Sequence, residues 1–159
     1  MEEFVKKMSM WGVGPKIMLP SYLILMILSF AHLRISISGS LNMPRSYLSI
    51  AAWIIICIGI IILLIADLQI RNALKENQLF TKGIFSVIRN PIYAAHIFFI
   101  MPGFCLLSDN ILTALSLLCA GILFNILIAK EEKVLDENFG EKYREYKSKV
   151  SRLLPRSRI

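Results

Sequence analysis

Four long apolar stretches, separated by shorter polar segments, dominate the pattern of residues along the chain. They cover residues 17–37, 47–66, 92–107 and 111–129. A helix needs about 20 mostly apolar residues to cross a bilayer, because the hydrocarbon core is about 30 Å thick and each residue rises about 1.5 Å. The second stretch holds no charged residue, whereas Pro20, His32 and Arg34 interrupt the first. The pattern predicts an all-α integral membrane protein with about four transmembrane helices.

The third and fourth stretches lie close together in the sequence. Only the segment 108–110 separates them, which predicts a tight helical hairpin. Pro102 and Gly103 predict a kink in the third stretch, because proline removes a backbone hydrogen bond. We therefore expect a single domain made of two parts. An N-terminal two-helix membrane hairpin covers residues 1–66, and a loop, the helical hairpin and a C-terminal helix follow in residues 67–159.

The chain after Ala129 has a different pattern. Its apolar and aromatic residues recur every three or four positions, at Leu135, Phe139, Tyr143, Tyr146 and Val150. That spacing places them on one stripe of a helix, and Gly140 is a point at which the helix can bend. We predict a C-terminal amphipathic helix. Such a basic helix commonly serves only as an interfacial anchor, and the sequence leaves that explanation open.

Composition and charge fix the class of protein and its orientation. An apolar content of 56% and a mean hydropathy of +0.63 exclude a water-soluble enzyme with a conventional core, a disordered chain and a disulfide-rich secreted domain. Lys and Arg number 18 against 11 Asp and Glu. Residues 1–16, 67–90 and 130–159 hold 16 of the 18 basic residues, whereas only Arg34 and Arg45 fall on the other side and the 108–110 turn has none. The positive-inside rule then predicts a multi-pass protein with both termini, and the C-terminal helix, in the cytoplasm.

The cysteines and histidines indicate no metal site. All three cysteines lie in apolar stretches without a CxxC pair, and they are expected to act as small hydrophobic residues. His32 and His96 each stand alone in an apolar stretch, without a partner at metal-ligand spacing. We expect membrane lipids as partners, and neither a bound metal nor nucleic acid.

Polar residues next to the third stretch predict an anion site. In Arg89-Asn90-Pro91, asparagine is a preferred N-cap and proline a preferred first helical residue. The free N–H groups of the helix start would then lie beside the Arg89 guanidinium, an arrangement that suits an anion. A capped helix with an arginine that sets topology is the alternative.

Glu131 and Glu132 follow the fourth stretch directly. Acidic residues at a helix C-terminus oppose the macrodipole, so helix stability does not explain them. If the third and fourth stretches form a hairpin, the two glutamates face the predicted anion site. A pocket with positive potential at one end and carboxylates at the other suits a zwitterionic ligand that bears hydroxyl groups. A solvated charge run is the alternative.

The loop between the second and third stretches contributes a third polar group. Residues 77–83 read NQLFTKG, a composition that suits a loop folding over a ligand, although an ordinary surface loop has the same character. No GxGxxG, P-loop, GxSxG or HExxH motif is present.

Two parts of the sequence resemble motifs of the isoprenylcysteine carboxyl methyltransferase family, whose wider group includes phospholipid N-methyltransferases. LFTKGIF at 79–85 and RNPIY at 89–93 resemble that family's L-x-T-x-G-x-Y and R-H-P-x-Y. EEKVLDENFGEKYREY at 131–146, followed by RLLP at 152–155, resembles its E-E-x-x-L-x-x-x-F-G-x-x-Y-x-x-Y…P tail. The resemblance covers over half the chain and does not extend to the first two apolar stretches.

The resemblance implies methyl transfer from S-adenosylmethionine to a lipophilic acceptor at the membrane–cytoplasm boundary. Asn90 and the helix start would hold the methionyl carboxylate, and Glu131 would meet ribose or ammonium groups. With Arg89 and Glu132 added from the pattern of charges, the expected cofactor site consists of Gln69, Asn77, Gln78, Leu79, Phe80, Phe85, Arg89, Asn90, Pro91, Ile92, Tyr93, Glu131 and Glu132. We assign no catalytic residue.

Three positions depart from the family pattern. Asn90 replaces a histidine, Phe85 a tyrosine, and Leu127 an arginine that is implied to contact the substrate. A carboxylate acceptor would need a fixed cation. The acceptor, a lipophilic small molecule or lipidated substrate whose nucleophile is a carboxylate, amine or thiol, therefore stays open.

Two other functions remain as alternatives. A membrane reductase using NADPH would share a related C-terminal pattern, but the extra phosphate would demand more basic residues than Arg89 and Lys82. A non-catalytic membrane scaffold would use its basic tail only to bind anionic lipids.

Overall fold

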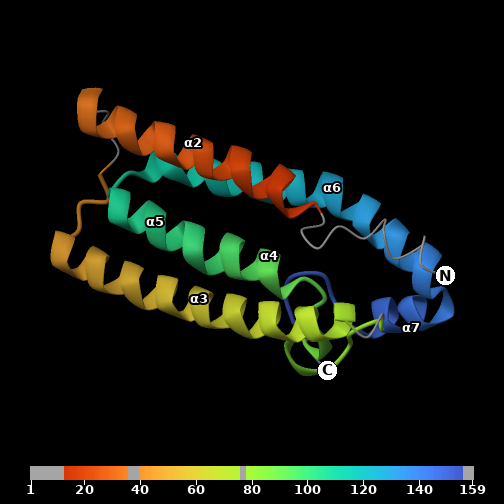
Figure 1. Cartoon of the computed structure of the whole chain (residues 1–159). Coiled ribbons are helices and arrows are strands. Elements are labelled where there is room, and N and C mark those ends of the chain that lie inside the picture. Colours follow the sequence, from red (N-terminus) through yellow and green to blue (C-terminus); the bar gives the residue numbers. More distant parts are fainter. Residues whose placement is uncertain (1–12, 36–39, 76–77, 156–159) are drawn as a thin grey trace.

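The computed structural model describes residues 13–35, 40–75 and 78–155 (Figure 1). Within them the protein is all-α, and four helical segments are long and apolar enough to cross a membrane. The predicted fold class is confirmed. The elements are α2 (Gly14–Ile35), α3 (Arg45–Lys75), η1 (Gly83–Ser86), α4 (Pro91–Ala95), η2 (His96–Ile100), α5 (Met101–Ser108), η3 (Ile111–Ala114), α6 (Leu115–Phe139) and α7 (Glu141–Lys149).

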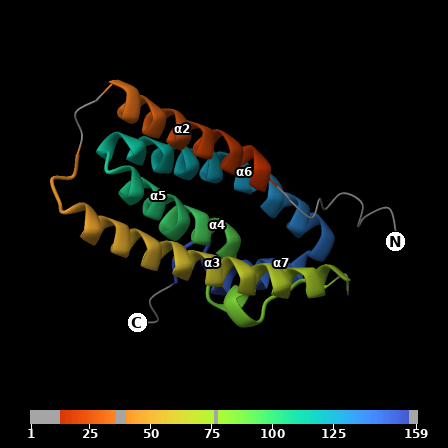
Figure 2. The same cartoon turned by 60° about the vertical axis from the view of Figure 1, so that its left-hand side comes forward.

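The helices form two packed pairs. α2 runs along α6, and α3 runs along the third span, which consists of α4, η2 and α5 (Figures 1 and 2). A buried cluster joins the pairs, with Ile17 of α2, Tyr93 and Met101 of the third span and Phe124 of α6 at its centre. The remaining faces of α2, α3 and α6 expose many large apolar side chains, as expected of surfaces that meet lipid.

Glycines allow α3 to approach the third span closely. A Cβ on Gly59 would lie 2.7 Å from Ile100 Cγ1 and 2.8 Å from Phe99 Cβ. A Cβ on Gly103 would press against the side chain of Ile56 and the backbone of Ala52. Small residues at these crossings let two helix backbones pack together in a bilayer.

We expect Gly59→Leu to lower the free energy of unfolding by about 1–3 kcal/mol, because overpacking forces side chains and backbone apart. Equilibrium unfolding in mixed micelles would measure the loss. Gly121→Leu is the matched control, since a Cβ on Gly121 meets nothing within 4 Å. Equal losses in both variants would show that close packing at Gly59 is not the cause.

The predicted irregularity of the third span appears one turn earlier than Pro102. Residues His96–Ile100 form a wide π-helical turn, in which the backbone N–H of Met101 bonds to the carbonyl of His96. Pro102 has no N–H to donate, and its ring would clash with the carbonyl four residues earlier. The wide turn just before the proline relieves that clash.

The hairpin between the third and fourth spans is tight, as predicted. Asp109 adopts a left-handed conformation with φ 48°, and Asn110 Oδ1 accepts a hydrogen bond of 2.9 Å from the Leu112 N–H. Asp109 also accepts a hydrogen bond of 3.0 Å from the Leu41 N–H. The hairpin is thereby tied to the chain that connects α2 and α3.

Two predicted boundaries are wrong. α3 continues beyond Ala66 to Lys75, which places Gln69 on a helix rather than in a loop. α6 continues through Glu131 and Glu132 to Phe139, so the two glutamates do not lie at a helix C-terminus. The amphipathic stripe is divided between α6 and α7, because Gly140, at φ 52°, breaks the helix instead of bending it.

Candidate functional site

A cavity of about 610 Å³ lies where α4 and α6 meet, enclosed also by α2, α3, α7 and the loop before α4. Its volume is in the usual range for a small-molecule site. Asn90 and Glu131 both line it, so the start of the third span and the fourth span share one cavity. Of the residues expected at the cofactor site, the following line it: Gln78, Leu79, Phe80, Phe85, Arg89, Asn90, Pro91, Ile92, Tyr93 and Glu131.

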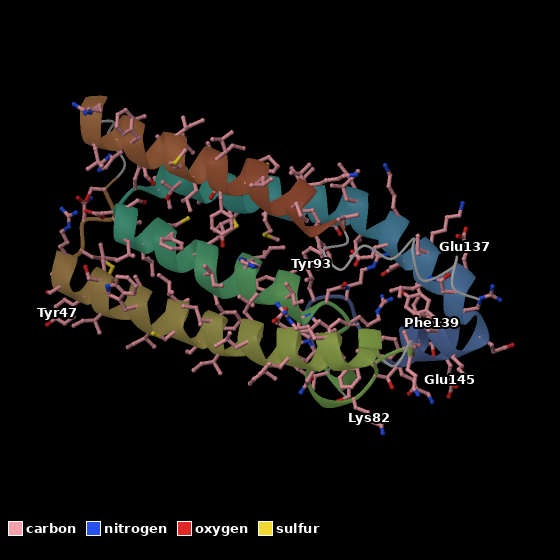
Figure 3. All side chains as sticks on the ribbon, viewed as in Figure 1. Tyr47, Lys82, Tyr93, Glu137, Phe139 and Glu145 are labelled. Carbon is pink, nitrogen blue, oxygen red and sulfur yellow. The ribbon has the colours of Figure 1, made fainter. Side chains whose placement is uncertain are left out.

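A carboxylate and a phenol mark one side of this cavity. The Tyr93 hydroxyl of α4 donates a hydrogen bond of 3.0 Å to Glu131 Oε2 of α6. A Cβ on Gly14 would lie 3.8 Å from the Tyr93 oxygen, so the start of α2 covers the cavity beside Tyr93. Figure 3 shows Tyr93 at the same end of the helices as Phe139 and Lys82, far from Tyr47. Tyr93 thus fixes the direction in which Glu131 presents its charge.

Arg89 supplies positive charge to the cavity wall. Its side chain is 8% exposed, and Nη1 lies 3.1 Å from both Glu132 Oε1 and the Tyr143 hydroxyl. Its Nε is buried and has no hydrogen-bond partner among the described residues. Buried guanidinium nitrogens almost always find an acceptor, so the environment of Arg89 leaves part of its hydrogen-bonding capacity unused at the cavity wall.

The C-terminal segment fixes the backbone that carries Arg89 and Asn90. The Arg89 N–H donates to the Ser151 carbonyl at 2.8 Å, and the Asn90 N–H donates to the Arg152 carbonyl at 3.1 Å. Ile88 and Ser151 form a parallel bridge. Asn90 does occupy the N-cap position, but the predicted side-chain cap is wrong: its Nδ2 donates to the Arg152 carbonyl at 3.2 Å.

Glu132 does not line the cavity but lies behind its wall, 6% exposed. Its carboxylate contacts three cations: Arg89 at 3.1 Å, Lys147 at 3.0 Å and Arg152 at 2.8 Å. The hydrogen bonds and charge of Glu132 raise the pKa of Arg152 above its ordinary value. Burial, with the charge of Glu132, raises the pKa of Tyr143 to about 12. Glu132 therefore holds α6, α7 and the C-terminal segment around Arg89.

Gln69 likewise acts on the loop rather than on the cavity. Its Oε1 accepts a hydrogen bond of 3.1 Å from the Ile84 N–H, and it packs against Gly83, whose φ is 59°. The rings of Phe80, in the loop, and Phe85, in η1, lie 5.5 Å apart, and both line the cavity. The Tyr146 hydroxyl donates to the Phe85 carbonyl at 2.6 Å. Asn77 lies outside the described residues.

Sequence reasoning missed several lining residues on the first two spans. Gly14, Pro15, Met18 and Leu19 come from α2, and Leu63, Leu64, Asp67, Ile70 and Arg71 come from α3. Arg71 Nε donates to Asp67 Oδ2 at 2.7 Å, an i, i+4 spacing that the sequence could have revealed. His96 was the other available signal, because an ionisable residue inside a membrane span is commonly functional. It lines the cavity as well.

The family of the chain follows from comparison with known proteins. The model of the phospholipid methyltransferase family matches residues 43–142, more than half of the chain. That range contains α3, the loop, the third span and all of α6, and therefore most of the cavity. A search of curated proteins gives no match. The chain belongs to the phospholipid methyltransferase family and is a membrane methyltransferase.

Proposed function

We propose that the protein transfers a methyl group from S-adenosylmethionine to a lipophilic acceptor drawn from the bilayer. One observation carries this proposal: Asn90, at the start of the third span, and Glu131, on α6, line the same cavity. The cavity thereby offers hydrogen-bond donors and a carboxylate to one guest of nucleotide size.

The donor set fits this cofactor. The positive charge of Arg89 at the cavity wall is suited to the methionyl carboxylate, and Glu131 is suited to ribose hydroxyls or the ammonium group. Phe80, Phe85 and Tyr146 give the cavity an aromatic side for the adenine ring. When bound, the cofactor supplies a methyl group on a positively charged sulfur. The protein's part is to hold the two reactants in line and to exclude water.

An apolar side of the cavity would admit the acceptor. Met18 and Leu19 of α2 lie on one edge, and Leu63 and Leu64 of α3 lie on another. Leu19 is 70% exposed and Leu64 54% exposed, so both also belong to the surface that meets lipid. A hydrocarbon chain can therefore stay in the bilayer while the polar end of the acceptor reaches the cavity.

An amine on a lipid headgroup is the acceptor that the site favours. Leu127 stands where the isoprenylcysteine pattern has an arginine. The two arginines that line the cavity already contact carboxylates, Arg71 at Asp67 and Arg89 at Glu132. With Arg89 assigned to the cofactor carboxylate and Arg71 paired with Asp67, the described lining offers no further lysine or arginine to a carboxylate acceptor. The basic segments around the cavity support a position on the cytoplasmic side by the positive-inside rule.

Ligand-dependent thermal unfolding in detergent would test the proposal. S-adenosylmethionine and S-adenosylhomocysteine should raise the melting temperature, and NADPH should not. Asn90→Ala should weaken S-adenosylhomocysteine binding about tenfold, since it removes the side chain that ties the helix start to Arg152. Asn125→Ala, on the exposed face of α6, is the control. Stabilisation by NADPH alone would favour a reductase, and no response to any ligand would favour a scaffold.

A further inference from the structure

His96 lines the cavity further along the third span than the expected cofactor residues of that span, Pro91, Ile92 and Tyr93. It lies five residues inside the third span from Pro91, about 8 Å along the helix. The other residues of the lining that come from this depth are the apolar Met18, Leu19, Leu63 and Leu64. His96 is thus the polar group among the side chains expected to receive the acceptor.

A hydrogen bond fixes the orientation of the His96 ring. The Tyr22 hydroxyl of α2 lies 2.8 Å from Nδ1, and the two rings meet edge to face with centroids 5.8 Å apart. Tyr22 does not line the cavity. Nδ1 is therefore held on the α2 side, and Nε2 is the ring nitrogen left for a guest.

The backbone at His96 is unusual in the same place. His96 is the first residue of the π-helical turn His96–Ile100. Wide turns of this kind are frequent at functional sites. Helix irregularity, cavity lining and a side chain held by a second helix all coincide at this one residue.

We propose that His96 takes up the proton that the lipid amine loses before methyl transfer. Tyr22 is the residue that positions His96. This inference rests on the proposed function. A lipid ammonium group loses one N–H proton to Nε2, which leaves a neutral amine and an imidazolium. The nitrogen lone pair then forms the N–C bond to the methyl carbon, while the C–S bond breaks and its electron pair stays on sulfur. The imidazolium returns its proton to water through the cavity mouth after the products leave.

In this arrangement Tyr22 accepts a hydrogen bond from Nδ1–H, so that Nε2 carries the lone pair. Glu131 is less suited to the step, since Tyr93 already donates to it. The other titratable groups that face the cavity are Asp67 and Arg71 from α3, Arg89 and Tyr93 beside and within α4, Glu131 from α6 and Tyr146 from α7.

The test compares His96→Gln and His96→Asn with wild type in nanodiscs that contain phosphatidylethanolamine. Turnover with labelled S-adenosylmethionine should fall about 100-fold at neutral pH. It should partly recover at high pH, where the amine loses its proton unaided. Binding of S-adenosylhomocysteine, measured by calorimetry, should change less than about threefold. Tyr22→Phe should shift the pH profile of turnover and leave that binding unchanged.

His32 gives a matched control, because the chain has only two histidines. His32 lies near the other end of α2 and does not line the cavity, so His32→Gln should keep wild-type turnover. In that variant His96 is the sole imidazole, and its proton resonance can be followed by NMR. Adding the lipid should shift that resonance, whereas lipid without an amine should not.

The possible failures are distinguishable. Wild-type turnover and pH profile in both His96 variants would overturn the role of His96 and leave the proposed function standing. A different pair of results would reassign His96 to the cofactor site. These are loss of S-adenosylhomocysteine binding in the His96 variants and a His96 resonance that lipid does not shift in His32→Gln. A wild-type protein that neither binds S-adenosylhomocysteine nor labels lipid would overturn the proposed function, and this inference with it.

Discussion

Glu132→Ala is expected to lower the free energy of unfolding by about 3–5 kcal/mol, the loss typical of breaking a buried ion pair from one side. The carboxylate is 6% exposed and contacts Arg89, Lys147 and Arg152. Lys147 and Arg152 are 46% and 41% exposed, and water can solvate them once Glu132 is gone. Arg89 is 8% exposed and would keep an uncompensated charge. That residual charge accounts for most of the expected loss.

Equilibrium unfolding in mixed micelles would measure the effect, with Glu137→Ala as the control. Glu137 lies on the same helix and pairs with Lys133 at 3.9 Å, but both side chains are more than half exposed. A surface pair of this kind contributes about 0–1 kcal/mol. A loss no greater in Glu132→Ala than in Glu137→Ala would contradict the role assigned to Glu132.

The same substitution should also impair the cavity at a distance. Without Glu132, Arg152 loses its two side-chain hydrogen bonds, and its segment holds the backbone of Arg89 and Asn90 less firmly. We therefore expect weaker S-adenosylhomocysteine binding, although Glu132 does not line the cavity. Glu132→Asp keeps the charge but shortens the side chain, so it separates the effect of charge from the effect of side-chain length. Its affinity for S-adenosylhomocysteine should lie between those of wild type and Glu132→Ala.

The sequence predicted that Asn90 and Glu131 lie close together, because their positions depend only on two neighbouring apolar spans and the short turn between them. Two apolar spans joined by three residues must run antiparallel, so the start of one faces the end of the other. The span lengths and the apolar periodicity carried that prediction without tertiary information. The same reasoning could not separate Glu131 from Glu132, because adjacent residues differ by about 100° around a helix. That rotation directs Glu131 toward Tyr93 and Glu132 toward the C-terminal segment.

The unpredicted parts of the site depend on contacts between residues far apart in sequence. The Asn90 side chain bonds to Arg152 rather than to its own helix, since the C-terminal segment lies beside it. Gln69 holds the loop through Ile84 because α3 extends further than its apolar stretch. Polar residues continue that helix once it leaves the bilayer, and no hydrophobic periodicity marks where it stops.

Glu131→Gln is expected to weaken S-adenosylhomocysteine binding about 10- to 100-fold, the range for losing a charged hydrogen-bond partner. The amide keeps the size of the side chain and its oxygen can still accept from Tyr93, so the fold should change little. What disappears is the negative charge that faces the cavity. Tyr93→Phe should have a smaller effect, because it leaves the charge and removes only the group that orients it.

Calorimetry in detergent would measure both affinities, with Glu137→Gln as the control for a charge lost from the exposed side of α6. The comparison isolates position, since the chemical change is identical at both sites. Unfolding measured in parallel should give Glu131→Gln within about 1 kcal/mol of wild type, because the hydrogen bond persists. Wild-type affinity in Glu131→Gln would mean that the carboxylate faces no part of the ligand. The cavity would then have to bind its guest through Arg89 and the aromatic side alone.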